Sequence, residues 1–337
     1  MPMTKLFNGA RHLLPVSERQ SLEKGLIKMK ARREGKLPAL ISAWPKFNDA
    51  FCDGLEWRTI TVVGARPGTG KTLFMEQLIS DIIIKNPDQE FRVLKFQMEM
   101  VDETSAIRKF SLITGADYNT LMSKDGNLVD KNLFQKCVEY YKDTVNTDLI
   151  SVVYDTCTVN EMCATIHHEL ERHRKPDGQY TNLLVTIDHS ALFKNDFGQK
   201  DKFDMLGALG EALTTMKKNY PIAFVVLSQL NRNIDDPKRQ LEGTYGNYVL
   251  DSDIYGSDAL LQHADVVMGM NKPSIRKIKK YGPEKFLIED PDTLVFHFLK
   301  SRNGMTRISF FKLDRTTMRI VEIPTPARET THKISVN

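Results

Sequence analysis

Residues 63–72 read VGARPGTGKT, a run of strand-forming residues that breaks into a glycine-rich turn and ends in Lys-Thr. A tight loop that enters a helix offers backbone N–H groups and the positive end of the helix dipole to a phosphate. A lysine at its end reaches the terminal phosphates, and the hydroxyl of the next residue can ligate Mg²⁺. The stretch therefore predicts a nucleotide phosphate site formed by Arg66, Pro67, Gly68, Thr69, Gly70, Lys71 and Thr72.

The match to the strict phosphate-loop pattern is one residue short. That pattern places a glycine five residues before Gly70, where this chain has Ala65 and, one residue earlier, Gly64. The flanks support the prediction, because residues 58–64 form an apolar β-branched run and residues 72–84 carry apolar residues at helical spacing. An ordinary glycine turn before a helix is the alternative, and it does not require the lysine and the threonine.

Composition limits what surrounds this site. The chain has 337 residues, of which 41% are hydrophobic and 27% charged, which favours one large α/β domain with appendages. We expect no membrane span, because no stretch of about 18 apolar residues occurs. The N-terminus lacks the features of a secretory signal, so we expect a cytoplasmic protein. The four cysteines lack paired C-x-x-C spacing, which predicts reduced, packing cysteines and no structural metal.

The net charge of +4 is mild and does not by itself indicate nucleic acid. Basic residues concentrate in KGLIKMKARREGK at residues 24–36 and in KPSIRKIKK at residues 272–280. A solvated face is the commoner explanation for such runs, and the alternative is an interaction surface.

Ser17 and Gln20 have the form of a helix capping box, so we predict a helix from about Glu18 to Arg33. Its apolar stripe is narrow and too small to fold alone. The helix must therefore dock on its own domain or on a neighbouring subunit.

From about residue 38 onward, short apolar runs alternate with helical patterns, as in a parallel sheet covered on both faces. The runs are TITVVG, RVLKFQM, LISVVYD, LLVTIDH, AFVVLSQ, ADVVMGM and LVFHFLK. They predict an α/β fold with a doubly wound or RecA-like, mostly parallel central sheet. We divide the chain into a helical arm at residues 1–37, a core at residues 38–325 and a tail at residues 326–337.

Polar residues follow three of these runs, at the strand ends where open α/β sheets gather their ligands. Glu99 could orient or deprotonate a water that attacks the γ-phosphate, and Asp188 is placed like the acidic residue of a Mg²⁺ shell. Gln229 offers an amide able to sense the γ-phosphate. Each residue alone has an ordinary structural explanation, but together with the phosphate loop they favour an ATP site.

The same segments resemble a known family. ARPGTGKT, KFQMEM, LLVTIDHSALF, FVVLSQLNR, LLQHADVVMGM and KSRNGMTRISFFKLDRTTMRI look like the ordered motifs of the RecA-like motor domain of DnaB-type replicative helicases. The resemblance covers roughly residues 38–322. It implies a ring-forming, hexameric, ATP- and Mg²⁺-dependent translocase on single-stranded DNA that unwinds duplex, of the 5′–3′ type.

The resemblance also assigns roles. By it, Lys71 and Thr72 would bind phosphate and Mg²⁺, Glu99 would be the catalytic carboxylate, Asp188 the metal-site acid and Gln229 the γ-phosphate sensor.

Lys300 and Arg302 resemble the basic pair that such helicases present to the nucleotide of the adjacent subunit. Charge supplied in trans would make hydrolysis depend on ring assembly. The alternative is a surface strand with a hairpin turn at Asn303-Gly304.

The chain departs from the family at its N-terminus, where fewer than 40 residues precede the motor instead of a helical domain. We interpret residues 17–35 as the family's linker helix, which packs against the next subunit. A minimal helicase of a phage or plasmid replication system, with a separate primase or loader, would fit this organisation.

Candidate DNA contacts lie in the polar stretch at residues 231–258, where the family's channel loops should be. Lys238, Arg239 and Tyr255 are the candidates there, and Tyr255 stands where the family usually has arginine. Arg108 matches a further basic position. A solvated loop or a surface ion pair explains any one of these residues equally well.

Three classes of function therefore remain. A hexameric DNA helicase leads, and a RecA-type recombinase and a non-translocating regulatory ATPase are the alternatives. Strand exchange without unwinding would favour the second, and ATP turnover indifferent to DNA would favour the third.

Overall fold

The structure is a computed structural model that describes residues 15–36, 39–125, 129–196, 201–240, 247–254, 257–315 and 317–328. It divides into two units, Met1–Ala39 and Leu40–Asn337. The first unit contains α1 (Glu18–Arg33), which begins after Ser17, whose hydroxyl accepts a hydrogen bond from the Gln20 N–H at 3.3 Å. The predicted N-terminal helix is confirmed, and none of its residues is buried.

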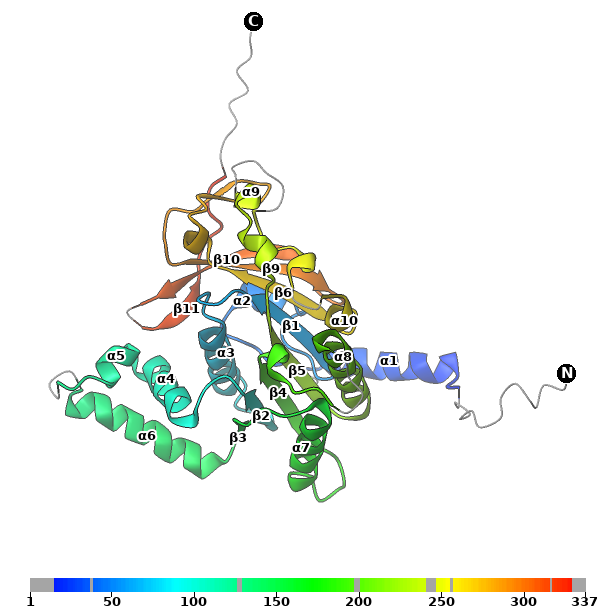
Figure 1. The fold of residues 1–337 in the computed structure, drawn as a ribbon. Helices are drawn as coiled ribbons and strands as arrows, with labels where there is room; N and C mark the ends of the chain where they lie inside the picture. Colours follow the sequence, from blue (N-terminus) through cyan, green and yellow to red (C-terminus); the bar gives the residue numbers. More distant parts are fainter. Residues whose placement is uncertain are drawn as a thin grey trace, which may run out of the picture. The chain divides into compact units, whose positions relative to one another are not determined.

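The second unit alternates strands and helices (Figure 1). Its strands are β1 (Thr59–Ala65), β2 (Phe91–Gln97), β3 (Ile150–Val153), β4 (Asn182–Asp188), β5 (Ile222–Gln229), β6 (Val266–Asn271), β7 (Lys280–Tyr281), β8 (Phe286–Leu287), β9 (Thr293–Ser301), β10 (Arg307–Asp314) and β11 (Arg319–Glu322). Its α-helices are α2 (Pro45–Asp49), α3 (Lys71–Lys85), α4 (Asp102–Thr114), α5 (Tyr118–Leu121), α6 (Lys131–Thr147), α7 (Val159–Arg172), α8 (Lys202–Asn219), α9 (Pro237–Gln240) and α10 (Ser257–Leu261). Short 3₁₀ turns are η2 (Ser190–Leu192), η3 (Arg232–Asp235), η4 (Asp251–Asp253) and η5 (Pro273–Arg276).

Within the described residues, nine strands form the central sheet in the order β11-β10-β9-β6-β1-β5-β4-β2-β3. Strands β1 to β6 pair in parallel, which confirms the predicted RecA-like arrangement. Each of the seven predicted apolar runs forms a strand of this sheet. The three strands beyond β6 pair antiparallel, and β10 and β11 were not among the predicted strands.

Both faces of the sheet are covered. Neighbouring residues of β1 belong to opposite cores: Val62 packs in the core under α7, α8 and α10, and Val63 packs in the core under α2 and α3. Figure 1 shows the two helical layers on either side of the sheet. Burial from both sides explains why the parallel strands read as continuous apolar runs rather than alternating ones.

Helix α3 is held on the antiparallel strands by an aromatic and polar contact. The Trp44 ring stacks on Phe74 of α3 with centroids 5.3 Å apart, and its Nε1–H donates to the Ile320 carbonyl at 2.9 Å. Gln77 of α3 pairs with both backbone groups of Ile320, at 2.7 and 2.9 Å. These bonds fix the helix that follows the glycine-rich loop.

None of the described helices has the length and hydrophobicity needed to cross a bilayer.

Candidate nucleotide site

The glycine-rich loop joins β1 to α3. Gly68 and Gly70 adopt φ angles of 77° and 96°, which L side chains rarely adopt, so the loop needs glycine at both positions. Thr69 is buried and closes the loop by donating its hydroxyl to the Arg66 carbonyl at 2.7 Å. No side chain caps the start of α3. Its first N–H groups are therefore available to a phosphate, as the sequence predicts.

Lys71 lies at the start of α3 with its ammonium group near the loop. Its Nζ donates to the Ala65 carbonyl at 3.2 Å. Burial lowers the pKa of Lys71, while the Asp188 and Glu99 carboxylates act in the opposite direction. The lysine thus lies between the loop and two acidic side chains, where its positive charge would balance the negative charge of a bound phosphate.

The strand register brings three further predicted residues to the same edge. Strands β1, β5, β4 and β2 are consecutive in the sheet, and their carboxyl ends lie together. Gln229 is paired with Ala65, and Asp188 is paired with Gln97, just ahead of the turn that carries the exposed Glu99. A hydrogen bond of 3.2 Å from the Met98 N–H to the Asp188 carbonyl ties that turn to β4.

Asp188 has the environment of a buried metal-site acid. Its Oδ2 accepts a hydrogen bond from the Thr72 hydroxyl at 3.3 Å, and its buried Oδ1 has no hydrogen-bond partner. Burial raises the pKa of Asp188 to about 6, and the Glu99 carboxylate adds to the effect. A carboxylate oxygen without a partner beside a hydroxyl is a donor set that fits Mg²⁺, which takes few protein ligands and completes its shell with phosphates and water. Among the described residues, no three His, Cys, Asp or Glu side chains are grouped around one metal position.

Lys300 and Arg302 lie at the other end of the sheet. Lys300 pairs with Val267 of β6, which pairs with Val62 of β1, three residues before Ala65. That separation is about 10 Å along the strand and about 10 Å across two strands. The structure therefore does not bring this pair to the phosphate loop of the same chain.

Both basic residues have defined contacts. Lys300 donates to the Leu261 carbonyl at 2.8 Å, and Arg302 lies 3.3 Å from the Asp265 carboxylate. Burial lowers the pKa of Lys300, and the neighbouring Arg302 charge lowers it further. Arg302 lies just after β9 and not on the strand, in the turn at Asn303-Gly304 that joins β9 to β10, so the hairpin expected there is present as well.

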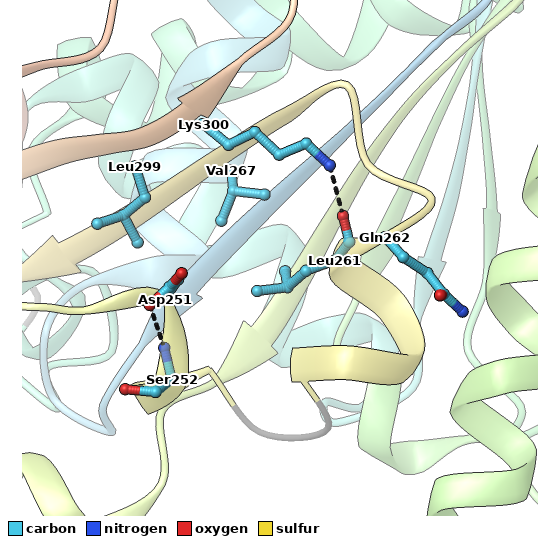
Figure 2. A pocket seen from close by; sticks show the side chains of 7 residues that line it. All are labelled: Asp251, Ser252, Leu261, Gln262, Val267, Leu299 and Lys300. Carbon is cyan, nitrogen blue, oxygen red and sulfur yellow. Dashed lines mark hydrogen bonds between the residues drawn. The ribbon is translucent and has the colours of Figure 1, made fainter.

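A hollow of about 540 Å³ adjoins Lys300 (Figure 2). It is lined by Asp251, Ser252, Leu261, Gln262, Val267, Leu299 and Lys300. Figure 2 shows the Lys300 side chain extending to the end of α10, where its ammonium group meets the Leu261 carbonyl. The hydrogen bond to Leu261 therefore holds the ammonium group beside this hollow.

Sequence reasoning missed two residues beside the phosphate loop. The Asp235 carboxylate lies 2.7 Å from the Arg66 guanidinium and 2.7 Å from that of Arg276, and so joins the loop to η3 and η5. An adjoining hollow of about 450 Å³ has Arg66, Asp235, Arg276 and Lys277 in its lining. The signal was present in the basic run at residues 272–280, but a solvated face is the wrong interpretation for Arg276, whose side chain is 6% exposed.

The DNA candidates have different environments. Arg108 on α4 and Lys238 on α9 are exposed. Arg239 is engaged within the chain, because its guanidinium forms a two-point ion pair with Asp253 and donates to the Tyr248 carbonyl at 3.0 Å. Tyr255 lies outside the described residues.

A glycine-rich loop between the first strand and its helix, with acidic residues at the carboxyl ends of two neighbouring parallel strands, defines a RecA-like P-loop nucleotide-binding domain. The particular family follows from comparison with known proteins. The model of the DnaB-like helicase C terminal domain matches residues 42–322, and the chain belongs to this family.

Curated relatives agree with this assignment. The replicative DNA helicase DnaB of Helicobacter pylori is 25% identical over 311 residues, which cover 82% of this chain and 58% of the relative. The replicative DNA helicase DnaB of Treponema pallidum is 23% identical over 234 residues, covering 66% of this chain and 46% of the relative. The chain spans about half the length of the curated relatives it matches.

Two solved structures share the fold. The chain is similar to an ATPase domain solved on its own, with a TM-score of 0.72 and 16% identity, over 90% of this chain and 99% of that one. It is also similar to a DnaB-like replicative helicase described with its interactions with primase, with a TM-score of 0.72 and 15% identity, over 96% of this chain and 70% of that one.

Proposed function

We propose that this chain is the ATP-hydrolysing motor of a DnaB-like replicative DNA helicase, which forms a hexameric ring and translocates on single-stranded DNA. The observation that carries the proposal is the separation of Lys300 and Arg302 from the phosphate loop, at the opposite end of the same sheet. The loop, Asp188, Glu99 and Gln229 meet at one end, and Lys300 and Arg302 lie at the other. Such a site is completed when one subunit's basic end meets the next subunit's phosphate loop.

The residues of the loop end bind and orient ATP. The N–H groups at the start of α3 and the Lys71 ammonium hold the phosphates, which positions the γ-phosphate over the carboxyl ends of β2, β4 and β5. Thr72 and Asp188 would hold Mg²⁺, which neutralises phosphate charge when it is bound. Glu99 orients the attacking water and accepts its proton, and the Gln229 amide contacts the γ-phosphate or that water.

Lys300 and Arg302 act on the nucleotide of the adjacent subunit. The guanidinium of Arg302 carries a permanent, delocalised charge suited to the transition state of phosphoryl transfer. Its side chain is 51% exposed, and its contact with Asp265 leaves part of the guanidinium accessible. Supplying this charge in trans makes hydrolysis depend on ring assembly.

DNA contacts follow the sugar-phosphate backbone and depend on salt. Arg108, Lys238 and Tyr255 are the proposed contacts. We assign Arg239 a positioning role instead. Its ion pair with Asp253, whose side chain is 2% exposed, joins α9 to η4 within the polar stretch that contains the other candidates.

Partners follow from the same assignment. We propose that α1 acts as a linker helix that docks on the next subunit, because it exposes Leu22, Leu26 and Met29 and buries none of its residues. A primase or a helicase loader is a further proposed partner. We place the activity in the cytoplasm, bacterial or that of the host of a phage.

The test is ATP hydrolysis by the purified protein with and without single-stranded DNA, alongside Lys71→Ala and a mass measurement. We expect DNA to stimulate turnover several-fold and Lys71→Ala to reduce turnover by at least about a hundredfold while the ring still assembles. Strand-exchange activity without unwinding would instead indicate a recombinase. Turnover indifferent to DNA would leave a regulatory ATPase.

A further inference from the structure

A second pocket lies at the β3 edge of the sheet, between α4, α6 and β3. Its volume is about 190 Å³, and none of its lining residues belongs to the nucleotide site. Four aromatic side chains contribute to its lining: Phe110, Tyr140, Tyr141 and Tyr154. Phe110 and Tyr140 face each other edge to face with centroids 6.4 Å apart. The lining therefore presents aromatic ring faces and edges, against which a further aromatic ring can stack or pack edge to face.

The floor of the pocket carries a buried group of three charges. The Glu76 carboxylate, 5% exposed, pairs with the Lys95 ammonium and, at 3.2 Å, with the Lys109 ammonium. Burial raises the pKa of Glu76, but the two lysines outweigh burial and lower it overall, so the carboxylate is ionised at neutral pH. Among the described residues that line the pocket, Glu76 is the single acid. Two ammonium groups against one carboxylate leave one positive charge in excess.

Lys95 is the less satisfied of the two lysines. Lys109 is well satisfied, because it also donates to the Ser80 hydroxyl at 2.6 Å. Lys95 has three N–H groups but, among the described residues, donates to Glu76 alone, although its side chain is only 10% exposed. A buried ammonium group with unused donors is costly, and an anion that enters the pocket would relieve that cost.

We propose that this pocket binds a small aromatic carboxylate, with its ring among the tyrosine and phenylalanine side chains and its carboxylate on Lys95. The volume suits a single ring rather than a drug-sized molecule, whose pockets are roughly 300–1,000 Å³. A carboxylate brings one negative charge, which matches the excess of one positive charge. A phosphate dianion would leave a negative charge uncompensated in the same buried place.

The test is isothermal titration calorimetry on the full chain, with benzoate as the probe. Three further compounds each differ from benzoate in one property. Benzamide lacks the negative charge, acetate lacks the aromatic ring, and phenyl phosphate carries a second negative charge. We expect saturable binding of benzoate, and binding at least about tenfold weaker for each of the other three compounds. Equal binding of benzamide or acetate would overturn the proposal, and tighter binding of phenyl phosphate would overturn the choice of a carboxylate.

Two variants and a control locate the site. Lys95→Met removes the excess charge while Glu76 keeps Lys109, and it should weaken benzoate binding at least about tenfold. Ala106→Phe, at an exposed position of α4 in the pocket lining, should block the pocket without touching the buried charges. Lys142→Met makes the same charge change at an exposed position of α6 and should leave binding unchanged. Undiminished binding by Ala106→Phe would overturn the assignment even if Lys95→Met failed to fold.

Discussion

Among single residues, Asp188 combines a buried carboxyl group with its proposed role in holding Mg²⁺. Its pKa is raised from 3.8 to about 6, chiefly by burial, so the neutral form is favoured in the folded chain. Below pH about 4 the carboxyl is neutral in the folded and the unfolded chain, and its full contribution to the free energy of unfolding is present. That contribution is lost as the pH rises through about 6, because ionisation is disfavoured in the folded chain. At neutral pH the buried charge costs roughly 1–3 kcal/mol in the absence of nucleotide.

We therefore expect Asp188→Asn to stabilise the nucleotide-free protein by roughly 1–3 kcal/mol at pH about 7.5, with little gain at pH about 4. Urea unfolding at both pH values measures this difference. The same variant should lose ATP turnover and most of the stabilisation that Mg²⁺ and ATP give the unmodified chain. A loss of stability at both pH values would show that burial of the charge is not the dominant effect.

Among the secondary-structure elements, β6 lies close against the segment before η4. A Cβ atom on Gly269 would lie 2.4 Å from Cγ1 and 2.8 Å from Cβ of Val249, whose carbonyl accepts a hydrogen bond from His297. We expect Gly269→Ala to lower the free energy of unfolding by roughly 1–3 kcal/mol, as overpacking does. Thermal unfolding measures the loss.

Two further variants test the cause of that loss. The double variant of Gly269→Ala and Val249→Ala should lose less free energy of unfolding than the sum of the two single variants, because truncating the Val249 side chain relieves the clash. Gly207→Ala on α8 is the matched control, since no atom lies within 4 Å of its added Cβ. It should be neutral or slightly stabilising, because alanine is the better helix former. If the losses of the two single variants simply add in the double variant, the strain does not come from contact between position 269 and Val249.

At the scale of the proposed ring, the two ends of the sheet can be tested in separate subunits. Lys71→Ala keeps an intact Arg302, and Arg302→Ala keeps an intact phosphate loop. We expect each variant alone to be nearly inactive, and mixed rings to regain part of the ATP turnover, because some interfaces combine the two intact halves. Mixing Arg302→Ala with the double variant is the control and should restore nothing. No recovery in mixed rings that do form would place Arg302 in its own subunit's site.

The arm provides a second test of assembly. Removing residues 1–35 takes away α1 and its exposed apolar side chains but leaves the second unit unchanged in sequence. We expect the truncated protein to form fewer rings at equal concentration, measured by light scattering, with ATP turnover falling in parallel. Unchanged oligomerisation would count against the linker interpretation.

Local patterns in the chain were enough to predict the parallel part of the fold and which of the proposed site residues lie together at one edge of it. The signals there were apolar runs buried on both faces, glycines in a tight turn and polar residues at strand ends. Lys71, Asp188, Glu99 and Gln229 could be grouped before the structure was known, because the carboxyl ends of parallel strands meet at one edge.

Contacts across long sequence separations, in contrast, emerged only from the folded chain. Register placed Lys300 and Arg302 at the opposite end of the sheet from the loop, and packing paired Arg239 with Asp253 and Arg276 with Asp235. The Glu76 charge cluster escaped prediction for the same reason. Pairing and burial of these groups depend on contacts between distant segments, and no local pattern encodes those contacts.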